Sequence, residues 1–331
     1  MRMPQPRAVL ALLVTLLLLQ AKPGLGAAAA AAAAPEGLFA RSNLVAWCIV
    51  PFDARKRGPE ARAEMLERLG FQQFAYDYRA EHIPTFDAEV EALQRHHVRL
   101  LAWWFPTTLN DEGRGILAVL KRHALRGVQL WVMGGGDAVK NPGEQELRVA
   151  SEASRIRPIA EAAAAQGCSV ALYNHGGWFG EPENQIAIIE RLRPAGITNV
   201  GIVYNLHHGH DHLPRLPALL ARMKPHLLAF NLNGMFRDGE RLGKKIVPIG
   251  QGELDGEVLG ILRDSGWQGP VGILNHTDED AEGRLRDNLE GLDWLVAQVP
   301  GHPAAARPQP RTWRDPSLEK PPVAKPGSAS S

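Results

Sequence analysis

The sequence predicts a single domain with a (β/α)8 barrel fold between residues 43 and 299. Eight short apolar runs are each followed by a segment with helical periodicity, at about 25–35 residues per unit. The runs are continuously apolar rather than alternating, as expected for parallel strands that are covered by helices. An open doubly wound sheet is the alternative fold. However, no G-x-G-x-x-G motif follows the first run, and eight units suit a closed barrel.

The predicted strands and helices alternate along this whole segment. Strands are expected at residues 43–52, 71–78, 98–105, 128–133, 169–173, 200–204, 226–232 and 271–274. Helices are expected at residues 59–70, 86–97, 115–125, 152–166, 183–192, 216–223, 256–265 and 282–299. The first helix shows the pattern clearly, because Pro59 opens it and Ala63, Leu66 and Leu69 repeat at three-residue spacing until Gly70.

Residues 1–34 have the three-part layout of a secretory signal peptide followed by an alanine-rich linker. Arg2 and Arg7 precede an apolar run at residues 8–19, and small residues follow it. The run is about a dozen residues long, whereas a membrane-spanning helix needs ~20. We therefore expect cleavage near Gly26 or in the alanine tract, and a secreted or periplasmic protein. An uncleaved anchor is the alternative.

The composition of the remaining chain limits the classes of partner. Residues 300–331 are rich in Pro, Ala, Lys and Ser, which predicts a disordered tail. The net charge of +1 gives no argument for binding to nucleic acid, or to a membrane beyond the export signal. Cys48 and Cys168 lie in or beside apolar runs, which favours small core residues, although export would permit a disulfide. Nothing in the sequence indicates an oligomeric state.

The carboxyl ends of the predicted strands carry most of the chemically active side chains. In a closed parallel barrel these ends form the catalytic face. Residues 207–212 (HHGHDH) place four histidines directly after a strand, where neutral imidazole can bind metal or exchange protons. A solvated polar loop is the alternative. Other strand ends supply Asp77, Arg79, Glu81, Trp104, Asn174, His175, Trp178, Asn205, Asn231, Asn233 and His276.

This collection of side chains suits a small-molecule sugar or polyol. Asn donates and accepts hydrogen bonds as hydroxyl groups do, and Trp offers a flat apolar face to a sugar ring. Two structural alternatives stay open: one of Trp103 and Trp104 packs in the core, and Asp77 and Arg79 form an ion pair. We predict substrate contacts from Asn174, Trp178, Asn205, Asn231, Asn233, Gln251, Trp104 and Arg79.

Four segments resemble the xylose isomerase-like TIM barrels, a family of sugar-phosphate isomerases, epimerases and type IV-like endonuclease barrels. The sequence A-L-Y-N-H-G-G at 171–177 is similar to the family's A-L-E-N-H-G-G, and N-L-H-H at 205–208 is similar to D-x-x-H. The segment N-L-N at 231–233 resembles H-x-K-D. The most specific match is P-I-G-Q-G-E-L-D at 248–255 with S-G-W-Q-G-P at 265–270, which is similar to P-x-G-x-G-x-x-D … G-Y-x-G-P.

The resemblance implies a divalent cation held by Glu, Asp, His and Glu from the fifth to eighth strands, with carboxylates that move a proton. This sequence departs from that pattern, because Tyr173, Asn205 and Asn231 replace the first three ligands and Leu274 falls near the fourth. A hard cation prefers carboxylates, so these replacements disfavour it. A zinc or manganese site is one prediction and a metal-free site is the equal alternative; the candidate ligands are His175, His208, His210 and His276.

We therefore expect an exported enzyme of isomerase, epimerase or lyase type that moves a proton on a carbohydrate or polyol. The catalytic candidates are His208, His175, Asp77 and Glu81, with His207 and His212 in supporting or solvent-exposed roles. A non-catalytic carbohydrate-binding barrel that has lost the family metal site is the main alternative. A glycoside hydrolase is a third hypothesis, which needs two facing carboxylates from Asp77, Glu81, Glu253 or Asp255.

Overall fold

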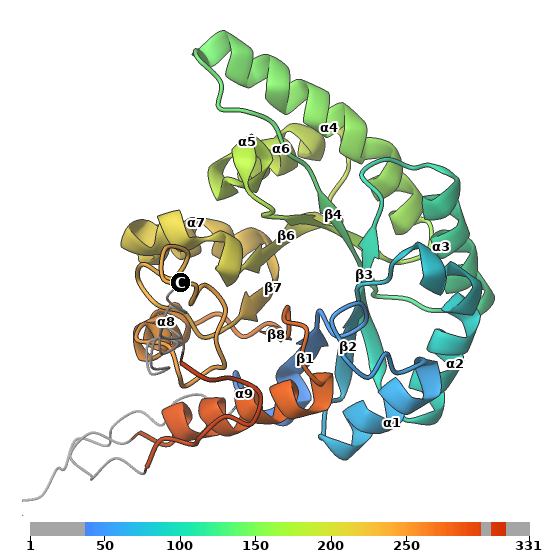
Figure 1. Ribbon diagram of the computed structural model, residues 1–331. Coiled ribbons are helices and arrows are strands. Elements are labelled where there is room, and N and C mark those ends of the chain that lie inside the picture. Colours follow the sequence, from blue (N-terminus) through green and yellow to red (C-terminus); the bar gives the residue numbers. More distant parts are fainter. Residues whose placement is uncertain (1–36, 299–305, 316–331) are drawn as a thin grey trace, which may run out of the picture. The chain divides into compact units, whose positions relative to one another are not determined.

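The central feature of the computed structural model, which describes residues 37–298 and 306–315, is a closed barrel of eight parallel strands (Figure 1). The strands follow the order of the sequence, and β1 pairs with β8 to close the barrel. This confirms the predicted barrel and excludes the open sheet. The strands are β1 Leu44–Trp47, β2 Gln73–Tyr76, β3 Arg99–Phe105, β4 Gln129–Met133, β5 Ser169–Tyr173, β6 Val200–Asn205, β7 Leu227–Leu232 and β8 Val271–Leu274.

An outer ring of helices follows the strands in turn (Figure 1). The helices are α1 Pro59–Arg68, α2 Phe86–Arg95, α3 Asp111–Arg122, α4 Pro142–Ala164, α5 Gly177–Gly180, α6 Pro182–Leu192, α7 Leu216–Met223, α8 Asp255–Asp264 and α9 Ala281–Val296. α4 begins at Pro142 rather than at residue 152, because Asn141 caps it by accepting a hydrogen bond from the Glu144 N–H. No helix within the described ranges is both long and apolar enough to cross a membrane.

The barrel interior is filled by side chains from alternate strand positions. On β1, Val45 and Trp47 belong to the interior cluster, whereas Leu44 and Ala46 pack outward against the helices. The indole rings of Trp47 and Trp131 meet edge to face with centroids 4.6 Å apart, and both residues are at most 2% exposed. These large rings fill the barrel interior, so a ligand has no path through the barrel and can bind only at one of its ends.

Asp255 organises the loop between β7 and α8, the segment that carries the most specific sequence match. Its carboxylate accepts hydrogen bonds from the N–H groups of Met235 at 2.9 Å, Gly250 at 2.7 Å and Gly252 at 3.0 Å. Gly250 has φ +89 and approaches Gly291 of α9 so closely that a Cβ would lie 2.8 Å from its Cα. The glycines and the aspartate of the motif are therefore explained by the shape of this loop.

Residues 306–315 lie against α9 and the same loop. The Pro308 carbonyl accepts a hydrogen bond from the Gln251 side chain at 2.8 Å, and Asp287 accepts from Arg311 and Thr312. These ten residues thus make defined contacts with the barrel, and the predicted disordered tail is not confirmed for them. The predicted signal peptide and the other tail residues lie outside the described part of the chain.

Asp255→Ala should destabilise the protein without changing the lining of the pocket. Three buried N–H groups lose their acceptor, and relief of the buried charge, whose desolvation raises the pKa of Asp255 to about 6, offsets only part of the loss, so the net cost is about 2–4 kcal/mol. Urea unfolding at pH 8 measures the loss. The matched control is Asp264→Ala on the same helix, whose side chain is 71% exposed and should change stability by less than about 0.5 kcal/mol. Equal effects would contradict this role for Asp255.

Candidate functional site

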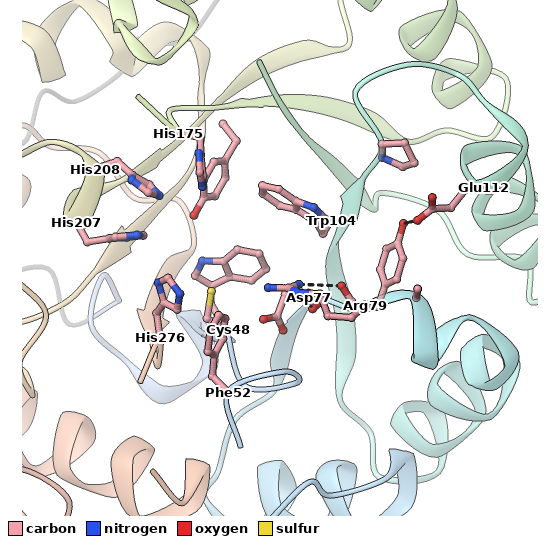
Figure 2. A pocket seen from close by; sticks show the side chains of 15 residues that line it. Cys48, Phe52, Asp77, Arg79, Trp104, Glu112, His175, His207, His208 and His276 are labelled. Carbon is pink, nitrogen blue, oxygen red and sulfur yellow. Dashed lines mark hydrogen bonds between the residues drawn. The ribbon is translucent and has the colours of Figure 1, made fainter. Parts of the chain in front are cut away.

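A pocket of about 410 Å³ opens at the carboxyl ends of the strands, the end of the barrel that the sequence predicted. Figure 2 shows histidines on one side of it and Trp104, Arg79 and Glu112 on the other, with Cys48 and Phe52 between them. The pocket is lined by Trp47, Cys48, Phe52, Asp77, Tyr78, Arg79, Ala80, Trp104, Pro106, Glu112, Tyr173, His175, His207, His208 and His276.

Four histidines from three strand ends form one wall. The His207 and His208 rings are 3.7 Å apart between centroids, the His175 and His208 rings are 4.5 Å apart, and His207 and His276 are 5.5 Å apart. Burial, together with the charges of His175 and Lys245, lowers the pKa of His208 to about 3. Burial likewise lowers the pKa of the other three, so the whole wall is neutral at pH 7.

Both nitrogens of the His207 ring are buried without a hydrogen-bond partner in the described chain. The ring is only 4% exposed and faces the pocket. A buried polar group without a partner costs free energy, and a ligand that supplies the partner recovers it. His207, which the sequence placed in a supporting role, is thus part of the pocket wall. A neutral imidazole offers one donor and one acceptor, which suits hydroxyl groups.

Asp77 follows β2 and supplies a buried carboxyl group to the pocket. It is 2% exposed, and its Oδ1 accepts a long hydrogen bond of 3.3 Å from the Val50 N–H. Its Oδ2 has no hydrogen-bond partner among the described residues. Burial raises the pKa of Asp77 to about 7, an effect that the nearby Arg79 charge only partly offsets. Asp77 can therefore both accept and donate a proton near neutral pH.

Asp77 and Arg79 do not form the ion pair that the sequence left open. No nitrogen of Arg79 lies within 4.0 Å of a carboxylate in the described ranges, and its Nη1 donates instead to the backbone carbonyls of Asp77 at 2.9 Å and Tyr78 at 2.8 Å. The guanidinium lies over the Phe52 ring at 5.6 Å from its centroid. The Tyr78 hydroxyl donates to Glu112, so that carboxylate already has a partner.

Three predicted asparagines lie in a fully buried layer below the pocket and do not line it. Asn174 joins the ends of β5 and β6, because its Oδ1 accepts from the Asn205 N–H at 2.6 Å and its Nδ2 donates to the Asn205 carbonyl at 3.1 Å. The Asn205 side chain donates to the Tyr173 hydroxyl. The amide of Asn231 has no partner within the described chain, and it occupies space that a Cβ on Gly272 would fill.

The remaining predicted residues are placed away from the pocket. Trp178 is buried and donates to Gln145, Gln251 donates to Pro308, and Asn233 donates to the carbonyls of Gly234 and Lys245. Glu81 is exposed on the 3-10 segment Ala80–Thr85, and His210 lies outside the lining. His212 is buried between the Tyr204 hydroxyl at 3.1 Å and Glu181 at 3.4 Å. Trp104 is in the pocket, whereas its neighbour Trp103 packs among the helices, as one of the two was expected to do.

The cation implied by the resemblance does not fit the side chains at the corresponding positions. Tyr173, Asn205, Asn231 and Leu274 are each at most 2% exposed and none carries a charge. The first two hydrogen-bond each other, and Leu274 has no donor atom. No group of three or more His, Cys, Asp or Glu within residues 37–298 and 306–315 has an arrangement that could hold a metal ion. The positions at which the resemblance implies a cation are therefore a layer of uncharged amide, phenol and aliphatic side chains here.

The fold and the pocket place this protein in the class of (β/α)8 barrels that carry titratable side chains at the carboxyl ends of their strands. More specifically, the chain belongs to the xylose isomerase-like TIM barrel family, whose model matches residues 64–298. No curated protein matches the sequence.

Solved structures with the same fold have low sequence identity to this chain. The E. coli 3-keto-D-glucoside 4-epimerase YcjR in its apo form is 15% identical with a TM-score of 0.53, over 77% of this chain and 98% of that one. The IolI protein with a zinc atom is 17% identical with a TM-score of 0.58, over 77% of this chain and 98% of that one. The probable 3-DHS dehydratase AsbF from Bacillus anthracis is 14% identical with a TM-score of 0.58, over 76% of this chain and 98% of that one. At these identities the likeness establishes the fold.

Several lining residues were not predicted from the sequence, above all Trp47 and Cys48 at the end of β1. Trp47 was included in a continuous apolar strand, and nothing in such a run tells which residues point inward. Cys48 adopts a left-handed backbone with φ 57, which ends the strand and places its side chain in the pocket wall. Both cysteines are free, and burial raises the pKa of the Cys48 thiol, so it is not a thiolate at pH 7.

The raised pKa of Asp77 predicts a pH-dependent cost to stability. Between the unfolded value of 3.8 and the folded value of about 7, the folded state holds a proton that the unfolded state has lost, so stability falls as pH rises across this window. Asp77→Asn removes the titration. The stability of the variant relative to the wild type should therefore increase between pH 4 and pH 8, by at most on the order of 4 kcal/mol. Urea unfolding at both pH values measures it, and parallel curves for the two proteins would contradict the raised pKa.

Proposed function

We propose that this protein is an enzyme that moves a proton on a carbohydrate or polyol, as an isomerase, epimerase or lyase. The observation that supports this most strongly is the buried carboxyl of Asp77, with its raised pKa, facing a wall of neutral histidines in one pocket. Trp104 and Phe52 add aromatic faces to the same pocket, which suit the C–H edges of a sugar ring.

In this proposal Asp77 is the base and the histidines polarise the carbonyl. The pKa of His208 is about 3 and that of Asp77 is about 7, so the carboxylate is the stronger base by about four pKa units. Asp77 takes a proton from a carbon next to a carbonyl group. The N–H of a neutral imidazole donates to the carbonyl oxygen as negative charge develops there. Delivery of a solvent-exchanged proton to the opposite face of the same carbon epimerises the substrate. Return of the proton to the former carbonyl carbon isomerises it, when the former carbonyl oxygen gains a proton and the neighbouring hydroxyl loses one.

Deuterium exchange tests the chemistry directly. Incubation with a panel of aldoses, ketoses and keto sugars in D2O should place deuterium at a carbon next to the carbonyl, as NMR detects. Asp77→Asn should slow exchange about 10²- to 10⁴-fold. His208→Ala should also abolish most activity with little loss of stability, whereas the control His226→Ala, a histidine before β7, should not.

The pH profile separates the two candidate bases. If Asp77 is the base, kcat/KM rises with pH, is half-maximal near pH 7 and reaches its plateau above that pH, because the carboxylate form is the active one. A half-maximal value already near pH 3 would assign the base to His208 instead.

A non-catalytic carbohydrate-binding barrel is the second candidate function. It is supported by the uncharged layer of Tyr173, Asn205 and Asn231 at the positions where the resemblance implies a cation. It predicts thermal stabilisation by sugars without deuterium exchange. A glycoside hydrolase receives less support, because Glu112 accepts the Tyr78 hydroxyl, Asp255 holds its loop and Glu81 is exposed, so Asp77 lacks a free facing carboxylate in the described pocket.

We also propose that the protein is exported to the periplasm or the medium. The support is the charged, apolar and small-residue order of residues 1–34. Expression of the full chain, followed by fractionation and N-terminal sequencing, should find a mature protein that begins near Gly26 or in the alanine tract. An intact N-terminus in the soluble cell interior would contradict export.

A further inference from the structure

Arg79 is a pocket cation without a carboxylate partner. Its Nη1 is fixed by two backbone carbonyls, and no hydrogen bond is formed by its Nε or Nη2 within the described residues. The Phe52 ring supports the guanidinium plane from one side. The group is therefore held in place with two donors to spare, an arrangement that can bind an oxyanion through a pair of N–H groups.

No carboxylate of the pocket is paired with this charge in the described chain. Glu112 keeps its negative charge, but it accepts the Tyr78 hydroxyl and lies more than 4.0 Å from the Arg79 nitrogens, and burial holds part of Asp77 protonated near pH 7. On the far wall the histidines are neutral, and Lys245 adds positive charge behind them, as the lowered pKa of His208 reflects. The uncharged layer below the pocket contributes nothing negative. A fixed guanidinium that has free N–H donors and no carboxylate partner favours an anionic group on the ligand.

We infer that the substrate is a sugar acid, such as a uronate or aldonate, whose carboxylate is bound by the Arg79 guanidinium. This rests on the proposed function for the polyol part of the molecule, which faces the histidines and Trp104. The acid group adds a second anchor across the pocket from the histidine wall (Figure 2). Arg79 is then the residue that selects acids over uncharged sugars.

A carboxylate fits this subsite better than a phosphate. Phosphate sites in proteins usually combine several cations or free backbone N–H groups. Beside Arg79 those groups are already used, because the Arg79 N–H donates to His82 Nδ1 at 2.9 Å and the His82 N–H donates to the Arg79 carbonyl at 2.8 Å. A single planar fork remains, which matches a planar carboxylate.

Binding to matched ligand pairs tests the inference without requiring turnover. Calorimetry and thermal shift with the full mature chain should show that D-glucuronate, D-galacturonate or D-gluconate binds at least tenfold more tightly than D-glucose, D-galactose or D-glucitol. Glucose 6-phosphate and inorganic phosphate, called the phosphate arms, are measured in the same way to compare phosphate with carboxylate binding. Arg79→Gln should weaken binding of the acid about 10- to 100-fold and leave the uncharged sugar unchanged, and Arg79→Lys should recover part of it.

The control variant is Arg99→Gln, an exposed arginine at the start of β3 that forms no ion pair within the described chain. It should bind all ligands as the wild type does. Equal affinity for acid and uncharged sugar, no binding of any acid at millimolar concentration, or a preference for the phosphate arms would each overturn the inference. The proposed proton transfer would survive that result if deuterium exchange on an uncharged sugar were observed. If acids bound through Arg79 but no deuterium exchange occurred on any sugar, the proposed proton transfer would be contradicted and the inference about acid binding would stand.

Discussion

Closure of the barrel is the constraint on which the rest of this structure depends. β1 pairs with β8 through four residues in register, from Leu44 with Val271 to Trp47 with Leu274. This pairing brings the end of β8 beside the end of β1, so that His276 packs against Phe52 at 4.1 Å between ring centroids. Residues separated by most of the chain then share one pocket, which Asp77 lines together with histidines that follow β5, β6 and β8.

Two features determine the pKa values of the titratable groups in the pocket: the uncharged layer beneath it and the burial of the groups in its walls. The layer formed by Tyr173, Asn205 and Asn231 carries polar atoms but no full charge that could pair with an ion in the pocket. In such surroundings the neutral forms of Asp77 and of the histidines are both favoured. The same desolvation therefore raises the pKa of the acid and lowers the pKa of the bases, which makes the carboxyl the more basic group.

The sequence was sufficient for the barrel, because eight apolar runs followed by helical periodicity have few other solutions. It was also sufficient for the end of the barrel at which the pocket lies, and for Asp77, Arg79, Trp104, His175, His208 and His276 as lining residues. It failed where a side chain could point either into the pocket or away from it. Asn174 and Trp178 are close in sequence to His175, yet one fastens two strands and the other packs under α4. His207 was predicted to have only a supporting or solvent-exposed role. It lies in the pocket wall because the 3-10 turn Leu206–His208 places two consecutive rings on the same side.

The loop motif that most clearly marks the family is explained here by backbone hydrogen bonds to Asp255 and by the close approach of Gly250 to α9. Its residues make no contact with the pocket. Such a motif reports how a chain folds, and it persists through any change at the strand ends that leaves the loop intact. Membership of the family and conservation of its reaction are therefore separate questions, and for this protein the second must be answered at the ends of β2 and β5 to β8.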